Sequence, residues 1–123
     1  MHWGHGRWWE AALALLLLAG FGGSAWAEQR WLGCKYTDVN GKPQSFLMAF
    51  DDRRGIASIL DAGTLVAGAN TTINFQSLRA RFPEFTITYN RNDGALSLTP
   101  RTGGILSGEC RRVAQPPGAP NLQ

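Results

Sequence analysis

The amino-acid sequence predicts an all-β domain, a small antiparallel β-barrel or sandwich of seven or eight short strands closed by one disulfide. Apolar and polar residues alternate in short runs along most of residues 30–113, and the turn pairs Asn40-Gly41 and Asp93-Gly94 separate some of these runs. The only two cysteines, Cys34 and Cys110, lie near the two ends of the region. Successive side chains of a strand point to opposite faces, so this alternation indicates strands with one buried face. Many short strands joined by local turns are typical of barrels and sandwiches.

The first 27 residues predict a secretory signal peptide. Arg7 precedes an apolar run over residues 11–21, and Ala25-Trp26-Ala27 has the small-residue pattern of a cleavage site. The run is shorter than the roughly 17 to 25 apolar residues of a membrane-spanning helix. We therefore expect export to the periplasm or the outside of the cell, cleavage after Ala27, and no stable membrane insertion after cleavage.

After cleavage, residues 28–113 form one small β domain in this interpretation. A domain of this size buries only about 60 to 70% of its unfolded surface, so its core gains from covalent support. An even number of cysteines in an exported chain predicts a disulfide between Cys34 and Cys110. In the chain-entropy description, closing a loop of this length stabilises the fold by about 4 to 5 kcal/mol.

The first two predicted strands cover residues 30–37 and 45–51 and form a hairpin around Asn40-Gly41. Asn-Gly pairs adopt the positive φ angles that tight hairpin turns need. In the first strand, Trp31 falls on the face opposite to Cys34. The inward-facing side chains are expected to be Leu32, Cys34, Tyr36, Phe46, Met48 and Phe50.

The middle of the chain is less regular. A charged turn over residues 51–55 leads to a short third strand over residues 56–60. Residues 61–70 show no clear period and predict either a short strand or a loop. Residues 71–76 alternate again and predict Ile73 and Phe75 facing inward, and residues 77–82 predict either a helical turn or a strand that carries Arg79 and Arg81 outward.

The clearest element is a hairpin in the stretch from Pro83 to Thr99, with its alternation beginning at Phe85. Phe85, Ile87 and Tyr89 alternate with polar residues before Asp93-Gly94, and Leu96 and Leu98 alternate after it. A last strand over residues 105–113 places Cys110 inward, so the disulfide would join the first strand to the last. Residues 114–123 contain three prolines and no charged residue, which predicts a flexible tail.

The composition excludes several kinds of catalytic site. Both histidines, His2 and His5, precede the predicted cleavage site, so the exported domain has none. Histidine-activated nucleophiles and histidine-ligated zinc are therefore not expected, and the paired cysteines leave no thiol for chemistry. No glycine-rich phosphate loop is present. We expect no cofactor, no metal site and no catalytic residue.

Carboxylates are the remaining candidates for catalysis. A carboxylate-dependent hydrolase needs two acids about 5 to 10 Å apart, one of them with a raised pKa. Most acids here lie beside turn residues, where carboxylates accept hydrogen bonds from the backbone. The hydrolase therefore stays an alternative hypothesis, with the candidates Asp38, Asp51, Asp52, Asp61, Glu84, Asp93 and Glu109.

Arginine pairs are the main candidates for binding. Guanidinium groups match carboxylate and phosphate in a two-pronged geometry, so clustered arginines predict an anion-binding patch. The alternative is a solvated surface, because the formal net charge is only +3. The candidates are Arg53 with Arg54, Arg79 with Arg81, and Arg111 with Arg112.

Trp31 is a further candidate, either half-exposed for a partner or packed against the tail. Nucleic acid is not an expected partner, because aromatic residues such as Phe85 and Tyr89 fall on the apolar face of their strand rather than on an open stacking platform. The sequence gives no indication of the oligomeric state.

The layout from Trp31 to Cys110 resembles the small periplasmic β-barrels of the lysozyme-inhibitor type. The shared features are a signal peptide, an early cysteine after an aromatic residue, strands with alternating phenylalanine and a cysteine in the last strand. That family presents a Ser-Gly loop and a later Tyr/Lys-Gly segment to its enzyme. This chain has Ala67-Gly68-Ala69-Asn70 and no matching lysine, so no inhibitory residue is carried over. The run Tyr89–Leu96 also resembles a hairpin of small exported bacterial proteins without an assigned activity.

Together these observations predict an exported, non-enzymatic β domain that binds a ligand or a protein in the cell envelope. An inhibitor of a cell-wall hydrolase such as lysozyme is the first alternative, and a carboxylate-dependent hydrolase is the second.

Overall fold

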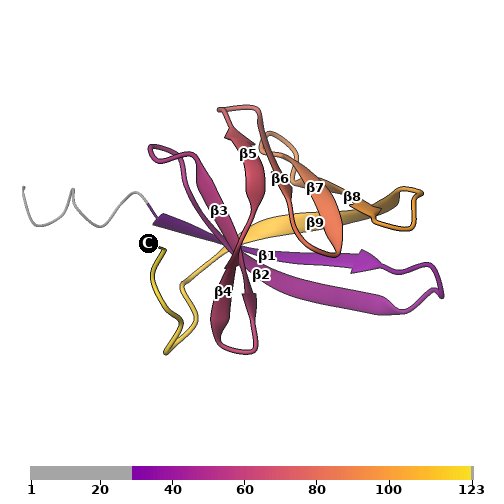
Figure 1. The fold of residues 1–123 in the computed structure, drawn as a ribbon, viewed down its shortest axis with the longest axis horizontal. Helices are drawn as coiled ribbons and strands as arrows, with labels where there is room; N and C mark the ends of the chain where they lie inside the picture. Colours follow the sequence, from indigo (N-terminus) through magenta and orange to yellow (C-terminus); the bar gives the residue numbers. More distant parts are fainter. Residues whose placement is uncertain (1–28, 123) are drawn as a thin grey trace, which may run out of the picture.

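The computed structural model describes residues 29–122, which form one antiparallel sheet of nine strands in the order β4-β3-β2-β1-β9-β8-β7-β6-β5 (Figure 1). The predicted signal peptide lies outside these residues. The strands are β1 (Gln29–Thr37), β2 (Pro43–Asp51), β3 (Ile56–Asp61), β4 (Thr64–Ala67), β5 (Ala69–Ile73), β6 (Ser77–Arg81), β7 (Phe85–Asn90), β8 (Ala95–Pro100) and β9 (Leu106–Val113).

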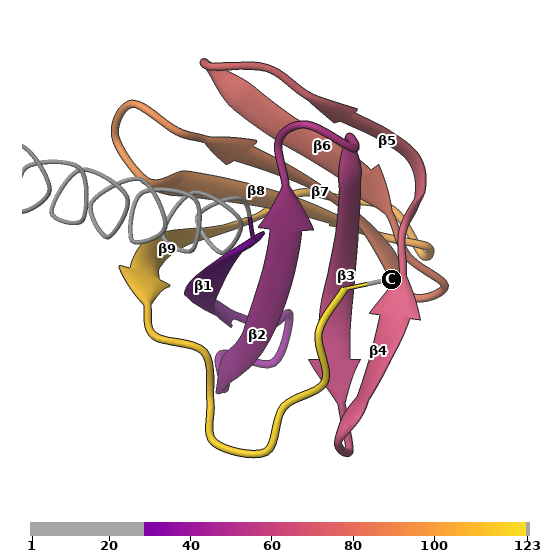
Figure 2. The ribbon, with the colours of Figure 1, turned by 90° about the vertical axis from the view of Figure 1, so that its left-hand side faces the viewer.

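A bend at Gly68 closes the sheet into a nearly complete barrel (Figure 2). The strand before the bend, β4, pairs with β3, whereas the strand after it, β5, pairs with β6. The Gly68 backbone N–H donates to the Ala57 carbonyl at 2.9 Å. A Cβ atom at Gly68 would lie 3.1 Å from both Ala80 and the Phe82 ring, so glycine allows this close approach. The division at Gly68 contributes to the count of nine strands, and the prediction of seven or eight was wrong.

The β3–β4 hairpin explains why residues 61–70 gave no clear pattern. Ala62 and Gly63 form its two-residue turn with φ angles of 51° and 82°. Positive φ at both central residues is the signature of a type I′ turn, which normally contains asparagine, aspartate or glycine. Alanine at the first position hides this turn from a sequence pattern.

The barrel interior is filled by the apolar half of the alternating pattern. Leu32, Met48, Leu78, Ile87 and Leu98 are fully buried. The inward sets predicted for the first two strands and for the 85–99 hairpin are confirmed, since they join the same core cluster: Leu32, Cys34, Tyr36, Phe46, Met48, Phe50, Phe85, Ile87, Tyr89, Leu96 and Leu98.

Phe75 is an exception, and its predicted inward position was wrong. Its side chain is 82% exposed. β5 ends at Ile73, and the side chain of Asn74 then accepts hydrogen bonds from the backbone N–H groups of Gln76 and Ser77, both at 2.8 Å. This asparagine turn ends the strand before Phe75, so the alternation no longer decides where its ring points.

The predicted disulfide is present. Cys34 and Cys110 are directly opposite each other in β1 and β9, with Cα atoms 4.0 Å apart. The first and last strands are neighbours in the sheet, so the bond fastens the centre of the strand order rather than an open edge.

Residues 114–122 lie against the outside of the barrel, where the sequence predicts a flexible tail. Figure 2 shows this segment running from β9 past the β3–β4 hairpin. Leu122 is only 7% exposed and packs with Trp31 and Ala49 in a second apolar cluster. The composition of this segment does not predict the contact, because one leucine changes the average hydrophobicity very little. The prolines also favour the ordered state, since they limit the entropy that the segment loses on ordering.

Candidate functional site

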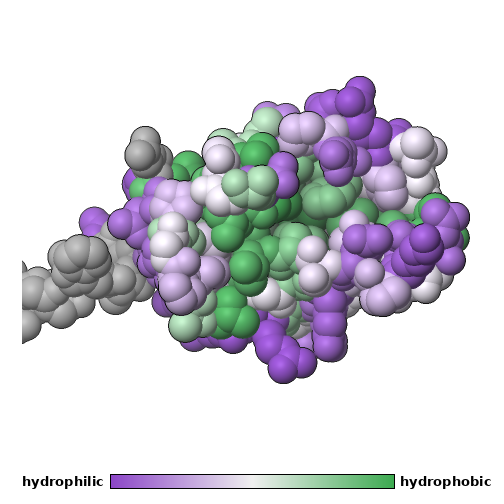
Figure 3. Space-filling model, turned by 90° about the horizontal axis from the view of Figure 1, so that it is seen from below, coloured by the Kyte–Doolittle hydropathy of each residue, from purple (hydrophilic) through white to green (hydrophobic). Residues whose placement is uncertain are grey.

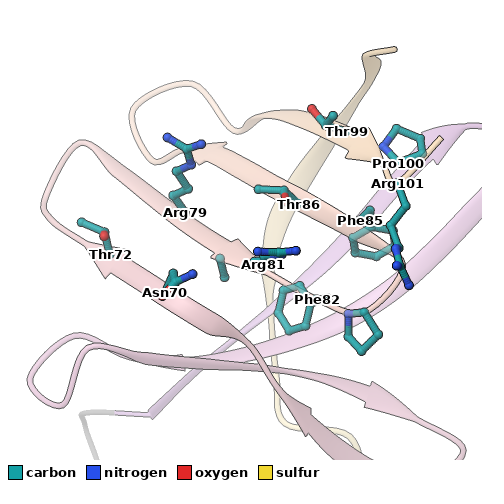
Figure 4. Close-up of a pocket in the computed structure, with 12 residues that line it drawn as sticks. Asn70, Thr72, Arg79, Arg81, Phe82, Phe85, Thr86, Thr99, Pro100 and Arg101 are labelled. Atoms are coloured by element: carbon teal, nitrogen blue, oxygen red, sulfur yellow. The ribbon is translucent and has the colours of Figure 1, made fainter. Parts of the chain in front are cut away.

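A groove of about 810 Å³ lies along β5 to β8 (Figure 4). Three arginines line it, and we call it the arginine groove: Arg79 and Arg81 from β6, and Arg101 from the turn after β8. Polar and apolar side chains complete its walls, among them Asn70, Thr72, Thr86, Thr99, Phe82, Pro83, Phe85 and Pro100.

The alternation of β6 places two of these arginines on one face. Leu78 and Ala80 are buried in the core, so Arg79 and Arg81 point outward, as the strand interpretation of this segment predicts. Two residues along a strand span about 7 Å, which sets the separation of their Cα atoms. Figure 4 shows both side chains on the same side of the sheet as Thr86.

Hydroxyl groups surround the arginines because the neighbouring strands carry threonine at the matching positions. Arg79 pairs with Thr72 of β5 and with Thr88 of β7. Arg81 pairs with Thr86, which in turn pairs with Thr99 of β8. Directly opposite residues in a sheet share a face, so these hydroxyls form rows beside the guanidinium groups.

Arg101 reaches the groove through the turn between β8 and β9. Its backbone N–H donates to the carbonyl of Glu84 at 3.1 Å, which links this turn to the β6–β7 turn. The chain therefore brings Arg101 to the end of the groove although it lies about 20 residues from β6 in sequence. Glu84 adds one negative charge to the same region.

The three arginines of the groove have no carboxylate partner among residues 29–122. The ion pairs in this part of the chain include those that join Arg30 and Arg91 to Asp52, Arg54 to Asp51, and Lys35 to Glu109. Unpaired guanidinium groups in a concave surface leave a local positive potential, which attracts anions.

Apolar side chains line the end of the groove at which Arg101 lies (Figure 4). Phe82 is buried, and its ring meets that of Phe85 edge to face with centroids 6.1 Å apart. The Phe85 ring also packs against the Phe46 ring, with the two ring centroids 5.8 Å apart. This packing fixes the two rings at the base of the groove, beside Pro83 and Pro100.

The other predicted arginine pairs do not join the groove. Arg53 and Arg54 lie in the β2–β3 turn, where their backbone N–H groups donate to Asp51. The Arg54 Nε atom also donates to Asp51 at 2.8 Å, and its Nη2 atom donates to the carbonyl of Leu122 at 3.4 Å. Arg54 therefore ties the turn to the tail. Arg111 and Arg112 lie on β9, which follows β8 in the sheet order and is not one of the strands that carry the groove.

Trp31 packs against the tail, which was the second of its two predicted alternatives. Its side chain lies under Leu122 and is 4% exposed. A partner therefore has no direct access to the indole while the tail is in place.

Two of the candidate acids, Asp38 and Asp51, accept hydrogen bonds from backbone N–H groups of the turns that follow them. The hydrogen bond from the Arg54 side chain lowers the pKa of Asp51, with help from the backbone N–H groups of Arg53 and Arg54. Hydrogen bonds from the Lys42 backbone and the Gln44 side chain lower the pKa of Asp38. A general acid needs a raised pKa, so these shifts go in the opposite direction.

Sequence reasoning missed Arg101 and the threonines of the groove. The alternating pattern assigns the polar side chains of these strands to solvent, and among them it indicates only the arginines as anion ligands. A pattern of Thr-x-Thr and Arg-x-Arg on adjacent strands is the signal that could have identified this face, since both sets must point to the same side.

Neither a protein-family model, nor a curated protein, nor a solved structure matches this chain. Within residues 29–122, no three histidine, cysteine, aspartate or glutamate side chains gather in a way that could hold a metal ion. That part of the chain also contains no helix long and apolar enough to span a membrane.

Proposed function

We propose that this protein is an exported, non-enzymatic binding domain of the cell envelope, and that the arginine groove holds an anionic ligand. The observation that carries this proposal is the presence of three arginines in one groove without carboxylate partners among the described residues. A concave site strengthens the attraction between these arginines and an anion, because water screens the charges less there.

The chemistry of the walls favours an acidic carbohydrate. Guanidinium groups bind carboxylate or phosphate, and the hydroxyls of Thr72, Thr86 and Thr99 can both donate and accept hydrogen bonds with sugar hydroxyls. Phe85 and Pro100 supply an apolar surface for the C–H face of a sugar ring. A bare inorganic anion would use only the arginines.

The location in the envelope rests on the predicted signal peptide and is supported by the disulfide. Disulfides persist in oxidising compartments and are rare in the cytosol. The Cys34–Cys110 bond therefore agrees with export. In the cell envelope, polymers that carry carboxylate and phosphate groups are available as ligands.

The test is a calorimetric titration at low ionic strength with hexagalacturonate, a carboxylated oligosaccharide. Uncharged maltohexaose and inorganic phosphate serve as comparison ligands. Removing one charge-assisted contact in Arg81→Gln should weaken hexagalacturonate binding about tenfold. The matched control is Arg112→Gln, which makes the same change in net charge outside the groove and should bind like the wild type.

Equal losses in both variants would reject the groove as the site, because they would reflect net charge alone. Binding of maltohexaose with equal affinity would reject the requirement for an anion. The lysozyme-inhibitor and hydrolase alternatives remain hypotheses from the sequence.

A further inference from the structure

A second surface lies on the opposite side of the barrel, where the tail covers an apolar face. We call it the tail face. It is built on the outer sides of β1 to β4 and β9, with Trp31 and Ala49 buried and several larger side chains half-buried around them: Leu47, Ile56, Leu60, Leu65 and Val113. Figure 3 shows apolar side chains gathered on the side of the molecule where β2 and β4 lie.

The tail holds this face with few contacts. Among residues 114–122, Leu122 is the buried side chain and Ala119 is partly buried against the same cluster. The Leu122 backbone N–H donates to the Gln29 side chain at 2.8 Å. Two longer bonds also hold the tail: Arg54 to the Leu122 carbonyl at 3.4 Å, and Gln29 to Asn121 at 3.5 Å. Ordering the backbone costs free energy for each residue, although less at the three prolines, and this cost opposes the gain from burying Leu122 and part of Ala119.

The tail also leaves a buried donor unpaired. The indole Nε1 of Trp31 has no hydrogen-bond acceptor among residues 29–122, although the side chain is almost completely buried. An unpaired buried donor is unfavourable, because it has lost its bond to water without gaining another. A segment that places a carbonyl oxygen at this indole would bind better than the tail does.

The apolar surface continues beyond the tail. Leu47, Leu60 and Val113 pack with the tail cluster and also line a separate hollow of about 570 Å³ beside it. Gly33 forms part of this hollow, and the absence of a side chain there keeps it open. The exposed Arg111 stands on its rim. The face is therefore longer than the segment that now covers it.

We propose that the tail face binds an extended, proline-containing segment of another protein, and that the tail is the intramolecular occupant which this segment displaces. The tail itself shows what the face accepts: residues 114–122 contain three prolines and place one aliphatic side chain against Trp31. Extended proline-rich segments commonly dock on aromatic-lined surfaces, since little entropy is lost. The specific partner has an aliphatic anchor at the Leu122 position and a carbonyl oxygen that accepts the Trp31 N–H. This proposal does not depend on the arginine groove.

The test measures binding in trans with the full-length, ¹⁵N-labelled protein. The probe is a synthetic peptide with the sequence of residues 114–123, and the control peptide carries asparagine in place of its leucine. The Trp31 indole N–H signal is the reporter, assigned with the variant Trp31→Phe. In Leu122→Ser the tail loses its anchor, so the probe should bind this variant at least about tenfold more tightly than the wild type, and the control peptide should not bind.

A dispersed amide spectrum shows whether Leu122→Ser keeps the barrel. If Leu122→Ser does not keep the barrel, the variant Gln29→Ala takes its place in the same titration, because it removes the hydrogen bond to the Leu122 N–H. The proposal is overturned if a folded variant with a released tail fails to bind the probe, if the control peptide binds equally well, or if binding leaves the Trp31 signal unchanged.

Discussion

Arg91 donates two hydrogen bonds of 2.6 and 3.1 Å to the Asp52 carboxylate, although the residues are 39 positions apart in the sequence. The Arg91 guanidinium also donates to the Asn74 carbonyl at 2.8 Å and lies 5.3 Å from the centre of the Phe50 ring. One side chain therefore connects the β2–β3, β5–β6 and β7–β8 turns at one end of the barrel. This contact holds the three turns together at that end of the barrel.

The first prediction concerns this contact. Arg91→Met should lower the free energy of unfolding by about 2 kcal/mol, since it removes the 2.6 Å ion pair with Asp52, from which Arg30 lies 3.9 Å away, and the contact with the Phe50 ring. Arg101→Met, which breaks no ion pair in the described part of the chain, should cost less than about 0.5 kcal/mol. Urea denaturation measures both, and similar losses would contradict the role given to Arg91.

The second prediction concerns the disulfide. Reduction should destabilise the fold by about 4 kcal/mol, because the bond closes a loop between cysteines 76 residues apart. Urea midpoints with and without a reductant give this difference. The double variant with Cys34→Ala and Cys110→Ala should not respond to the reductant. Two free thiols in the native, unreduced protein would contradict the prediction.

The third prediction concerns acid stability. The pKa of Asp51 is lowered in the folded state, chiefly by the Arg54 side chain, whereas in the unfolded chain it is about 3.9. The stabilisation from its ionised form is therefore complete above about pH 5 and disappears as the pH falls through the folded-state pKa. The urea midpoint should fall more steeply below pH 4 in the wild type than in Asp51→Asn. Parallel curves would show that Asp51 does not contribute.

The fourth prediction concerns Gly108, which pairs with Tyr36 in β1 and with Leu96 in β8. A Cβ atom at this position would lie 2.8 Å from the Tyr36 Cβ and would overlap the Lys35 carbonyl. Gly108→Ala should therefore destabilise the protein by about 3 kcal/mol. Gly33→Ala is the matched control, because its nearest neighbour is the movable Val113 side chain at 3.2 Å, and it should cost about 1 kcal/mol. Thermal unfolding compares the two variants, and equal shifts would argue against the close β1–β9 approach.

Alternation predicted the interior well because it reports burial directly. Ile87 and Tyr89 are buried where the pattern places them, and so are Leu96 and Leu98. The turns were harder, since their conformation depends on a few backbone angles. Ala62 adopts a positive φ angle that its residue type rarely takes, so the sequence does not distinguish this hairpin from a loop.

The groove was only partly predictable. Arg79 and Arg81 are outward because of the local strand period, which the sequence contains. Arg101 reaches them through the turns that follow β6 and β8, and this proximity depends on the closed sheet rather than on any local pattern. The contact between Leu122 and Trp31 has the same origin, because it joins residues from opposite ends of the described chain.

Binding in the arginine groove is measured most directly by a map of the arginine Nε–H signals in the ¹⁵N-labelled protein as hexagalacturonate is added. We expect the signals of Arg79, Arg81 and Arg101 to shift together, while those of Arg54 and Arg91, already held by carboxylates, stay in place. Shifts centred on Arg111 and Arg112, or spread evenly over all arginines, would contradict it.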